Sequence, residues 1–294
     1  MKRVSIIGLG LMGGSLGLAL KAHGSKVTVH GYTRSPERRT IALQRGAVDA
    51  VFATPGEAVE GADIVVYCAP ILAIPRLVRE TLPSLKRGAL LTDVGSTKSF
   101  LVREIGRIAR GMSVTFVGSH PIAGSELQGI EAAREDLYKG ATVVVTPDRK
   151  TPKPAVKQIE LFWKGMGADV CRMNPDDHDH ILARTSHLPH LVAALLATTV
   201  GRGRETKKIA RYCGAGFRDT SRVAEGGPDI WGDILKTNSL AVADELKAYR
   251  DQVDDLVDQL ARGQFVQVQR FLEKGRSVRR TLLQKKTTSC EEAS

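Results

Sequence analysis

Cysteine is scarce in this chain of 294 residues, which carries only four, at Cys68, Cys171, Cys213 and Cys290. They are widely separated and none belongs to a C-x-x-C pair, so the spacing excludes a disulfide framework. We therefore predict free thiols and a location in the reducing cytoplasm.

Long apolar runs are also missing. No stretch of about eighteen consecutive apolar residues occurs, which excludes a transmembrane helix. The start, Met1 to Arg3 followed by an apolar stretch to Leu20, resembles a secretory signal. The apolar region of a signal would not normally carry the five glycines found here, at Gly8, Gly10, Gly13, Gly14 and Gly17. We therefore predict neither a signal nor a membrane partner.

Acidic residues are outnumbered, because 32 Asp and Glu face 43 Lys and Arg, for a formal net charge of +11. This excess suits an anionic partner. No short basic run is interleaved with aromatic residues, as a nucleic-acid surface would prefer, so we predict no nucleic-acid partner, and the charge leaves a small anionic substrate open. The content of 42% hydrophobic and 26% charged residues excludes disordered, collagen and coiled-coil classes.

Short β-branched runs alternate with helical patterns in the first half, which indicates a parallel sheet covered by helices. Helices are predicted over Gly14–His23 and about Pro154–Met166. The predicted strands are Arg3–Gly8, Lys26–Tyr32, Ile64–Cys68, Ala89–Asp93, Thr115–Gly118 and Thr142–Thr146, with a further short run at Asp169–Arg172.

From Asn174 onward, long helical patterns take over, at His178–Val200, Ser239–Arg262 and Val266–Lys285. The sequence therefore predicts an α/β fold, with a Rossmann-like parallel-sheet domain at 1–173 and an all-α helical domain at 174–294. We expect the polar tail from Lys285 to Ser294 to be frayed.

The segment Gly8-Leu9-Gly10-Leu11-Met12-Gly13 matches G-x-G-x-x-G between a predicted strand and a predicted helix. The first glycine permits a tight turn, the second lets the backbone approach a pyrophosphate, and the third brings the helix against the strand. An ordinary glycine-rich turn is the alternative. We predict a dinucleotide site here.

The second strand ends Gly31-Tyr32-Thr33-Arg34, without the carboxylate that holds the ribose hydroxyls in NAD-binding forms. Thr33 and Arg34 could instead receive a phosphate, with Arg38 and Arg39 one turn further on. We favour NADP over NAD. The alternative is that these arginines form a solvated surface patch.

The segment Gly118-Ser119-His120-Pro121-Ile122-Ala123-Gly124-Ser125-Glu126 follows a predicted strand. We therefore expect His120 on a loop at the carboxyl edge of the parallel sheet, where ligands bind. Taken alone, a loop histidine is more often a surface residue. Two further segments favour a functional role, namely Thr92-Asp93-Val94-Gly95-Ser96-Thr97-Lys98 and Ser186-His187-Leu188-Pro189-His190.

Together with Gly216-Phe217-Arg218-Asp219-Thr220-Ser221-Arg222, these segments resemble the prephenate and arogenate dehydrogenase family of tyrosine biosynthesis. The resemblance runs from the first strand to about Lys236, and the rest matches only as a helical pattern. It implies oxidative decarboxylation of a cyclohexadienol, and a homodimer that pairs through the helical half. We expect no regulatory or mutase extension.

The resemblance also implies roles for single residues. His120 would accept the ring hydroxyl proton as a neutral base near pH 7, and Ser96 would bind the same hydroxyl or orient His120. Arg222 would bind a substrate carboxylate through its guanidinium fork, with Arg218 as a rival. The remaining substrate-binding residues would be His187, Glu126 and Asp219. The cofactor-binding residues would be Gly8, Gly10, Leu11, Met12, Gly13, Thr33, Arg34, Ala69, Pro70 and Ser96.

Each of these residues has a structural alternative. Ser96 could cap the following helix, His187 and His190 could be satisfied core histidines, and Arg222 could pair with Glu225 on the surface. The four functional segments together, in this order, favour the site. The run Asp176-Asp177-His178-Asp179-His180 lacks H-E-x-x-H spacing, and acidic residues suit a helix start. We therefore predict no metal.

Two other functions remain open. A 3-hydroxyacid or pyrroline-carboxylate reductase shares the glycine-rich start and the helical second half, but the hydroxyacid group carries a lysine that His187-Leu188-Pro189-His190-Leu191-Val192-Ala193 lacks. A non-catalytic regulator that senses NADP would need no arginine beside a histidine. The sequence leaves open the choice between prephenate and arogenate, and feedback inhibition by tyrosine.

Overall fold

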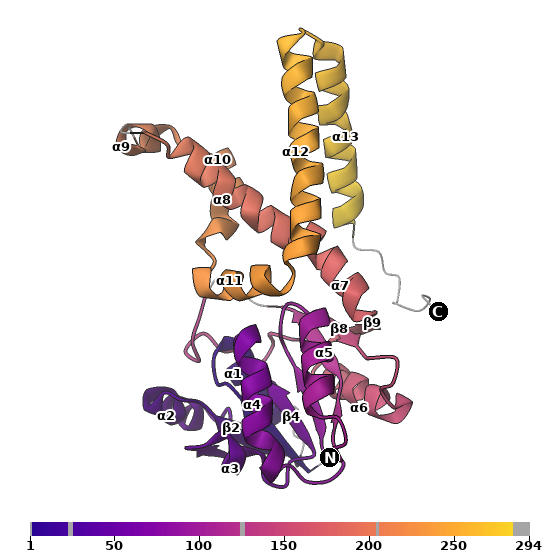
Figure 1. Ribbon diagram of the computed structural model, residues 1–294. Helices are drawn as coiled ribbons and strands as arrows, with labels where there is room; N and C mark the ends of the chain where they lie inside the picture. Colours follow the sequence, from indigo (N-terminus) through magenta and orange to yellow (C-terminus); the bar gives the residue numbers. More distant parts are fainter. Residues whose placement is uncertain (1, 23–25, 124–126, 204–205, 285–294) are drawn as a thin grey trace.

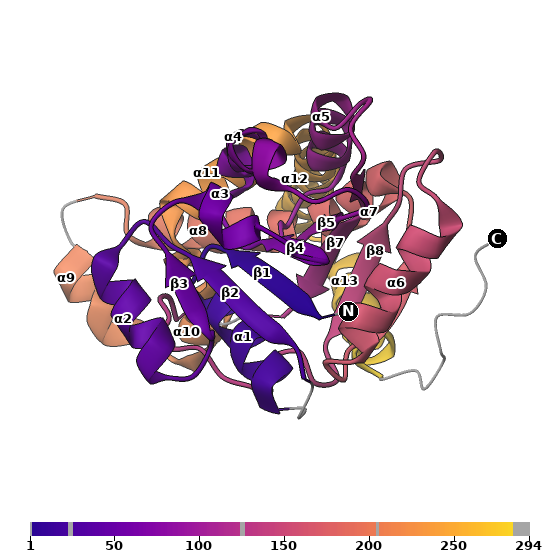
Figure 2. The same cartoon turned by 90° about the horizontal axis from the view of Figure 1, so that it is seen from below.

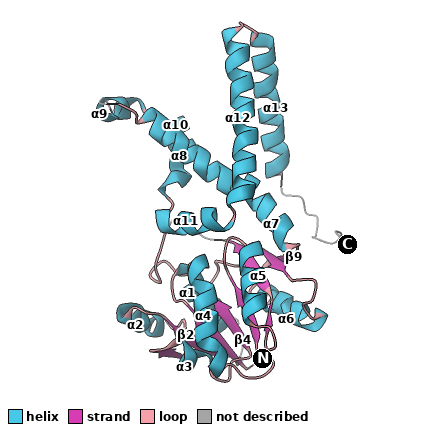
Figure 3. Cartoon of the chain, in the orientation of Figure 1, coloured by secondary structure: helices cyan, strands magenta, loops and turns pink. Residues whose placement is uncertain are grey.

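The structure is a computed structural model that describes residues 2–22, 26–123, 127–203 and 206–284. The strands gather in one half of the molecule and helices alone make up the other half, as the magenta and cyan colours of Figure 3 show. The described chain therefore has the predicted order, an α/β half followed by an all-helical half. His23, Cys290 and the predicted tail lie outside the described residues.

The first half is built on a six-stranded sheet in the order β3-β2-β1-β4-β5-β6, and every neighbouring pair is parallel. This is the strand order of a dinucleotide-binding Rossmann sheet, in which the chain switches direction between β1 and β4. The strands are β1 (Arg3–Ile7), β2 (Thr28–Tyr32), β3 (Ala50–Phe52), β4 (Ile64–Tyr67), β5 (Leu90–Asp93) and β6 (Thr115–Phe116). The sequence did not predict β3, which is only three residues long.

Two apolar cores lie on opposite faces of this sheet because neighbouring strand residues point to opposite sides. Val4 and Ile6 pack with α1 (Leu11–Ala22), α2 (Pro36–Gln44) and α6 (Lys153–Lys164). Ile7, Val65 and Tyr67 pack with α3 (Pro55–Val59), α4 (Ile74–Thr81) and α5 (Ser99–Ile108). Figure 2 shows α3, α4 and α5 on one side of the strands and α1 on the other.

The segment around His120 is a strand and not a loop, which corrects the prediction. After β6 the chain enters a second sheet of three strands, β7 (Gly118–Ile122), β8 (Thr142–Thr146) and β9 (Asp169–Arg172), in the order β7-β8-β9. β7 is antiparallel to β8, and His120 lies opposite Val144. Pro121 suggested a loop, but an edge strand tolerates proline because one side of it needs no ladder hydrogen bond.

One long helix, interrupted by a π-helical turn, opens the second half. It comprises α7 (Pro175–Leu182), a π-helical turn (Ala183–His187) and α8 (Leu188–Val200). The sequence predicted a single helix over His178–Val200. Pro189 explains the irregular turn, because a proline in the first turn of α8 has no backbone N–H to donate to the preceding turn.

Shorter helices follow, and then a long hairpin. They are α9 (Thr206–Ile209), α10 (Ala215–Ser221), α11 (Pro228–Thr237), α12 (Ser239–Ala261) and α13 (Phe265–Leu283). The last two agree with the predicted helices to within two residues. They run side by side and project away from the sheets (Figure 1). Within the described ranges, no helix is both long and apolar enough to cross a bilayer.

Candidate active site

The glycine-rich turn between β1 and α1 has the shape that a pyrophosphate needs. Gly8 has φ of +112°, and a Cβ there would stand 2.1 Å from the carbonyl oxygen of Cys68. A Cβ on Gly13 would stand 1.9 Å from the carbonyl oxygen of Gly8. A Cβ on Gly10, by contrast, would meet no described atom within 4 Å. The turn therefore packs tightly on the protein side and stays open where a dinucleotide would approach, at the start of α1.

The loops after β2 and β4 reach the same sheet edge, because the carboxyl ends of parallel strands share one edge. Thr33 is buried, and its carbonyl oxygen accepts a hydrogen bond of 2.9 Å from Nε of Arg39. Arg34 is exposed. Ala69 and Pro70 follow β4, and the amide nitrogen of Ala69 lies beside Gly8. Arg39 thus supports the loop that presents Arg34 to solvent.

A buried ion pair fixes the loop after β5. Nζ of Lys98 contacts the carboxylate of Asp93, and both side chains are fully buried. The same Nζ donates a 2.8 Å hydrogen bond to the carbonyl oxygen of Ser119, the residue before His120. Ser96 lies between the two charged residues and is half-buried. Lys98, not Ser96, stands at the N-cap of α5, so the capping alternative for Ser96 is wrong.

His120 is held in place by its strand. The preceding Ser119 donates from Oγ to the carbonyl oxygen of Asp93 at 2.8 Å and accepts from Nε1 of Trp163 at 3.0 Å. The His120 side chain is 7% exposed. Burial, reinforced by the positive charge of the neighbouring Lys98, holds the pKa of His120 well below the usual 6.5. His120 is therefore a neutral imidazole at pH 7.

His187, on the π-helical turn, has one nitrogen partnered and one not. The amide Nδ2 of Asn238 donates to the main-chain oxygen of Asp179 at 2.7 Å and lies 3.3 Å from Nδ1 of His187. Because an amide N–H only donates, Nδ1 is the acceptor and the hydrogen of the neutral ring is on Nε2. That Nε2 is buried and has no hydrogen-bond partner. His187 thus offers a free N–H donor, unlike a satisfied core histidine.

We expect His187 to stay neutral throughout the physiological pH range. Burial lowers its pKa from 6.5 to about 4, although the carboxylate of Asp179 opposes this shift. Its imidazole NMR signals should therefore not move when the protein is titrated across neutral pH. Titration of His187 near its ordinary pKa would contradict the assignment.

The predicted carboxylate-binding residues lie on a neighbouring part of the helical half. Arg218 and Asp219 are exposed on α10, and Arg222 is exposed at the start of a 3₁₀ turn (Arg222–Glu225). That turn packs on α8, and the adjacent Val223 hydrogen-bonds His190 through its backbone. His190 in turn stacks on Trp231 at 3.5 Å between ring centroids. Glu126 lies outside the described residues.

The structure also brings in two residues that the sequence analysis did not select. His178 and Asp179 of α7 are buried, and Nε2 of His178 lies 2.9 Å from Nδ1 of His120. They lie in a run of charges that we interpreted as the acidic start of a helix. A histidine inside that run was the one signal that could have pointed to them.

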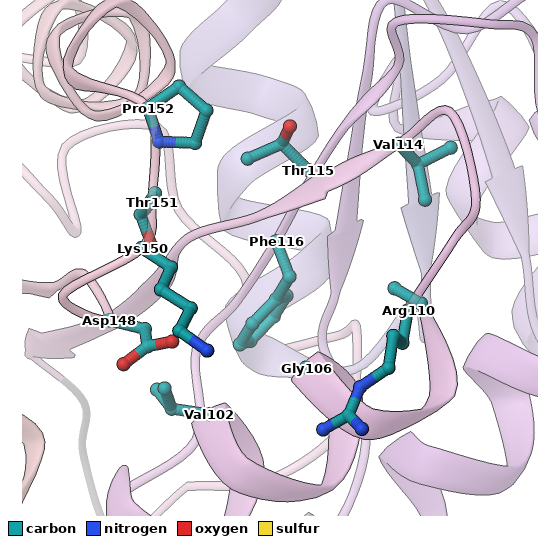
Figure 4. Close-up of a pocket in the computed structure, with 11 residues that line it drawn as sticks. Val102, Gly106, Arg110, Val114, Thr115, Phe116, Asp148, Lys150, Thr151 and Pro152 are labelled. Carbon is teal, nitrogen blue, oxygen red and sulfur yellow. The ribbon is translucent and has the colours of Figure 1, made fainter.

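A cavity of about 290 Å³ lies elsewhere, between α5, β6 and the residues after β8. Figure 4 shows Phe116 in this cavity, with Arg110 and Lys150 at its sides. Of the described residues that line it, none is a predicted site residue. The predicted site residues lie instead where the glycine-rich turn, the loop after β5, β7 and the helices α7 and α8 meet, and this junction is the candidate active site.

Comparisons with known proteins agree with this arrangement. The sequence model of the prephenate dehydrogenase nucleotide-binding domain matches residues 16–172, and that of the prephenate dehydrogenase dimerization domain matches residues 174–274. A cyclohexadienyl dehydrogenase of Zymomonas mobilis is 36% identical over 244 residues, which are 82% of each chain.

Two solved structures are similar over most of their length. The prephenate dehydrogenase of A. aeolicus, in complex with hydroxyphenyl propionate and NAD+, has a TM-score of 0.90 at 30% identity and covers 96% of this chain and 98% of its own. The Synechocystis arogenate dehydrogenase has a TM-score of 0.82 at 29% identity and covers 96% of this chain and 100% of its own.

Proposed function

Because the chain belongs to the prephenate dehydrogenase family, we propose that it catalyses the NADP-dependent oxidative decarboxylation of prephenate, arogenate or both. The observation that carries the proposal is His120, a buried imidazole kept neutral at pH 7. It lies beside the loop that follows β5, at the sheet edge where the glycine-rich turn begins. A neutral imidazole at this place can take a proton from a substrate hydroxyl.

The residues present fit a dinucleotide. The open space at Gly10 suits a pyrophosphate, with Leu11, Met12 and Gly13 at the start of α1 beneath it. Ala69 and Pro70 after β4 and Ser96 after β5 would line the cofactor further along the same edge. When bound, the nicotinamide supplies an acceptor for the hydride from ring carbon 4, and loss of the ring carboxylate as carbon dioxide leaves an aromatic ring.

The side chains of this protein have separate tasks in that reaction. His120 takes the proton of the hydroxyl on carbon 4, and Ser96 binds the same oxygen. His187 donates its unpartnered Nε2–H to the substrate. Arg222 binds a carboxylate, and Glu126 and Asp219 belong to the polar rim of the pocket. The purified protein should therefore convert prephenate or arogenate, and inactivity with both substrates and both cofactors would contradict the proposal.

Preference for NADP follows from the residues after β2. Thr33 and the exposed Arg34 stand where an acidic residue would favour NAD. We expect a higher kcat/KM with NADP than with NAD in the wild type. Arg34→Ala should lower kcat/KM for NADP about tenfold, since a hydrogen bond to a charged group contributes roughly 1.5 kcal/mol or more, and should leave the value for NAD nearly unchanged.

The matched control is Arg76→Ala. Arg76 is an exposed arginine on α4 that pairs with Glu80, away from the glycine-rich turn. It should leave both kcat/KM values at their wild-type level. A wild type that prefers NAD, or an Arg34→Ala variant that loses activity equally with both cofactors, would show that Arg34 does not bind the extra phosphate.

We also propose that the chain is a homodimer formed through the hairpin of α12 and α13. The hairpin exposes many large apolar side chains, and apolar surface gathered in this way marks an interaction site. These side chains include Val253, Val257, Leu260, Phe265, Val266, Phe271, Leu272, Val278, Leu282 and Leu283. We further propose that the boundary between the two domains lies between residues 173 and 174. We also propose that the protein is located in the cytoplasm.

A further inference from the structure

His178 and Asp179 connect α7 to the candidate base through a line of three side chains. Nδ1 of His178 lies 2.8 Å from Oδ1 of Asp179, and Nε2 of His178 lies 2.9 Å from Nδ1 of His120. His178 is fully buried and Asp179 is 3% exposed. The two rings stand edge to face, with centroids 5.1 Å apart.

Asp179 is ionised. Burial by itself disfavours the carboxylate, but hydrogen bonds from His178 and from the backbone amides of Lys98 and Ser99, at 2.7 and 2.9 Å, hold the pKa of Asp179 below its usual value. An ionised carboxylate has no hydrogen to donate. The hydrogen between Asp179 and His178 is therefore on Nδ1 of His178.

His178 is neutral, because burial lowers its pKa below 6.5 even though Asp179 opposes the shift. A neutral imidazole with its hydrogen on Nδ1 has a lone pair on Nε2. That lone pair faces Nδ1 of His120, so the hydrogen between the two rings belongs to Nδ1 of His120. The neutral His120 ring then has no hydrogen on Nε2.

We propose that His178 is a positioning residue which, backed by Asp179, fixes His120 in the tautomer whose Nε2 is the free proton acceptor. The inference rests on the proposed function. The hydroxyl proton of the substrate goes to Nε2 of His120, and the ring gains one positive charge. Nδ1 keeps its hydrogen and donates it to His178 more strongly, because charge-assisted hydrogen bonds are stronger than neutral ones.

Substitution of His178 is a sharper test than substitution of Asp179. The carboxylate of Asp179 also accepts the amide hydrogens of Lys98 and Ser99 at the start of α5, whose N-cap has no side-chain hydrogen bond of its own. Loss of that carboxylate would disturb the loop of Ser96 as well. His178 makes its two side-chain hydrogen bonds only along the line from Asp179 to His120.

The first test compares His178→Leu with His178→Gln. Leucine removes the acceptor, and kcat should fall by roughly 10- to 100-fold, less than the 10²–10⁴-fold that a base itself contributes. Glutamine can place a carbonyl oxygen near Nδ1 of His120, so kcat should recover in part. KM for the dinucleotide should not change in either variant. The control is His180→Leu on the exposed face of the same helix, which should behave as wild type.

The pH profile separates positioning from loss of structure. Without the acceptor the imidazolium of His120 is less stable, so its pKa falls and the acid limb of kcat/KM should move to lower pH in His178→Leu. The other titratable groups that face His120 or His178 are Lys98, His187, Asp93 and Asp179, and all four are unchanged in this variant. Wild-type kcat with an unmoved acid limb would overturn the proposal.

A second measurement does not depend on activity. Correlation of ¹⁵N and ¹H in the imidazole rings reports which nitrogen bears the hydrogen, and the His120→Asn variant identifies the His120 signals. We expect His120 to show hydrogen on Nδ1 in the substrate-free wild type, and His178→Leu to lose this single form. Hydrogen on Nε2 of His120 in the wild type would overturn the inference. A wild type that has hydrogen on Nδ1 of His120 but is inactive with the substrates would count against the proposed function alone.

Discussion

Replacement of His120 by asparagine should lower kcat by about 10²–10⁴-fold, the usual contribution of a positioned acid–base group. Asparagine keeps a polar side chain in β7 but cannot take a proton. Affinity for the dinucleotide should change little, because the glycine-rich turn follows β1 and its shape depends on Gly8 and Gly13. Steady-state kinetics and a direct binding measurement with NADP check both parts.

The pH profile gives an independent check of the same residue. The pKa of His120 lies well below 6.5, so the base is fully available at neutral pH and kcat should fall only as the pH drops through that low pKa. This acid limb should be absent in His120→Asn. Near-wild-type kcat, or an acid limb that survives the substitution, would show that His120 is not the base.

Replacement of Arg222 by alanine should raise KM for the substrate by about thirtyfold or more. Loss of one partner of a buried charge pair costs roughly 2–5 kcal/mol, and every 1.4 kcal/mol is a factor of ten. Arg222 is exposed in the single chain, so an effect of this size requires that bound substrate and the surrounding protein exclude water from the contact. An exposed ion pair would contribute only about 0–1 kcal/mol and change KM a few-fold.

Arg218→Ala is the matched comparison, because Arg218 lies four residues earlier and is equally exposed. It should change KM little. A large rise in KM for Arg218→Ala together with a small one for Arg222→Ala would reverse the two assignments. A small change in both would mean that the substrate carboxylates are bound elsewhere.

Much of the nucleotide-binding half could be predicted, because its signals are local. A β-branched run followed by glycines specifies β1 and the turn after it, and the sequence placed β4 and β5 to within one residue. Long amphipathic patterns likewise specify α12 and α13. The short strand β3 was missed because three half-buried residues give no periodic pattern.

The parts of the site that could not be predicted depend on contacts between distant segments. β7 forms because Gly118–Ile122 pairs with Thr142–Thr146. No pattern within Gly118–Ile122 itself predicts this pairing with a distant strand. His178 and Asp179 lie in an acidic run, and they are buried where α7 packs against α5 and β8. A role for His120 could be proposed from a family resemblance, but its neighbours His178 and Asp179 could not be predicted.

The π-helical turn at Ala183–His187 makes the number of residues in this segment as important as their kind. A π-turn holds about one residue more than an α-turn, and each residue of an α-helix rotates the chain by about 100°. Deletion of one residue there would restore a continuous helix and rotate α8 by about that angle relative to α7. His178 would keep its place beside His120, while His190 would turn away from Trp231. Apart from His187, substitutions in this turn should therefore be tolerated far better than changes of its length.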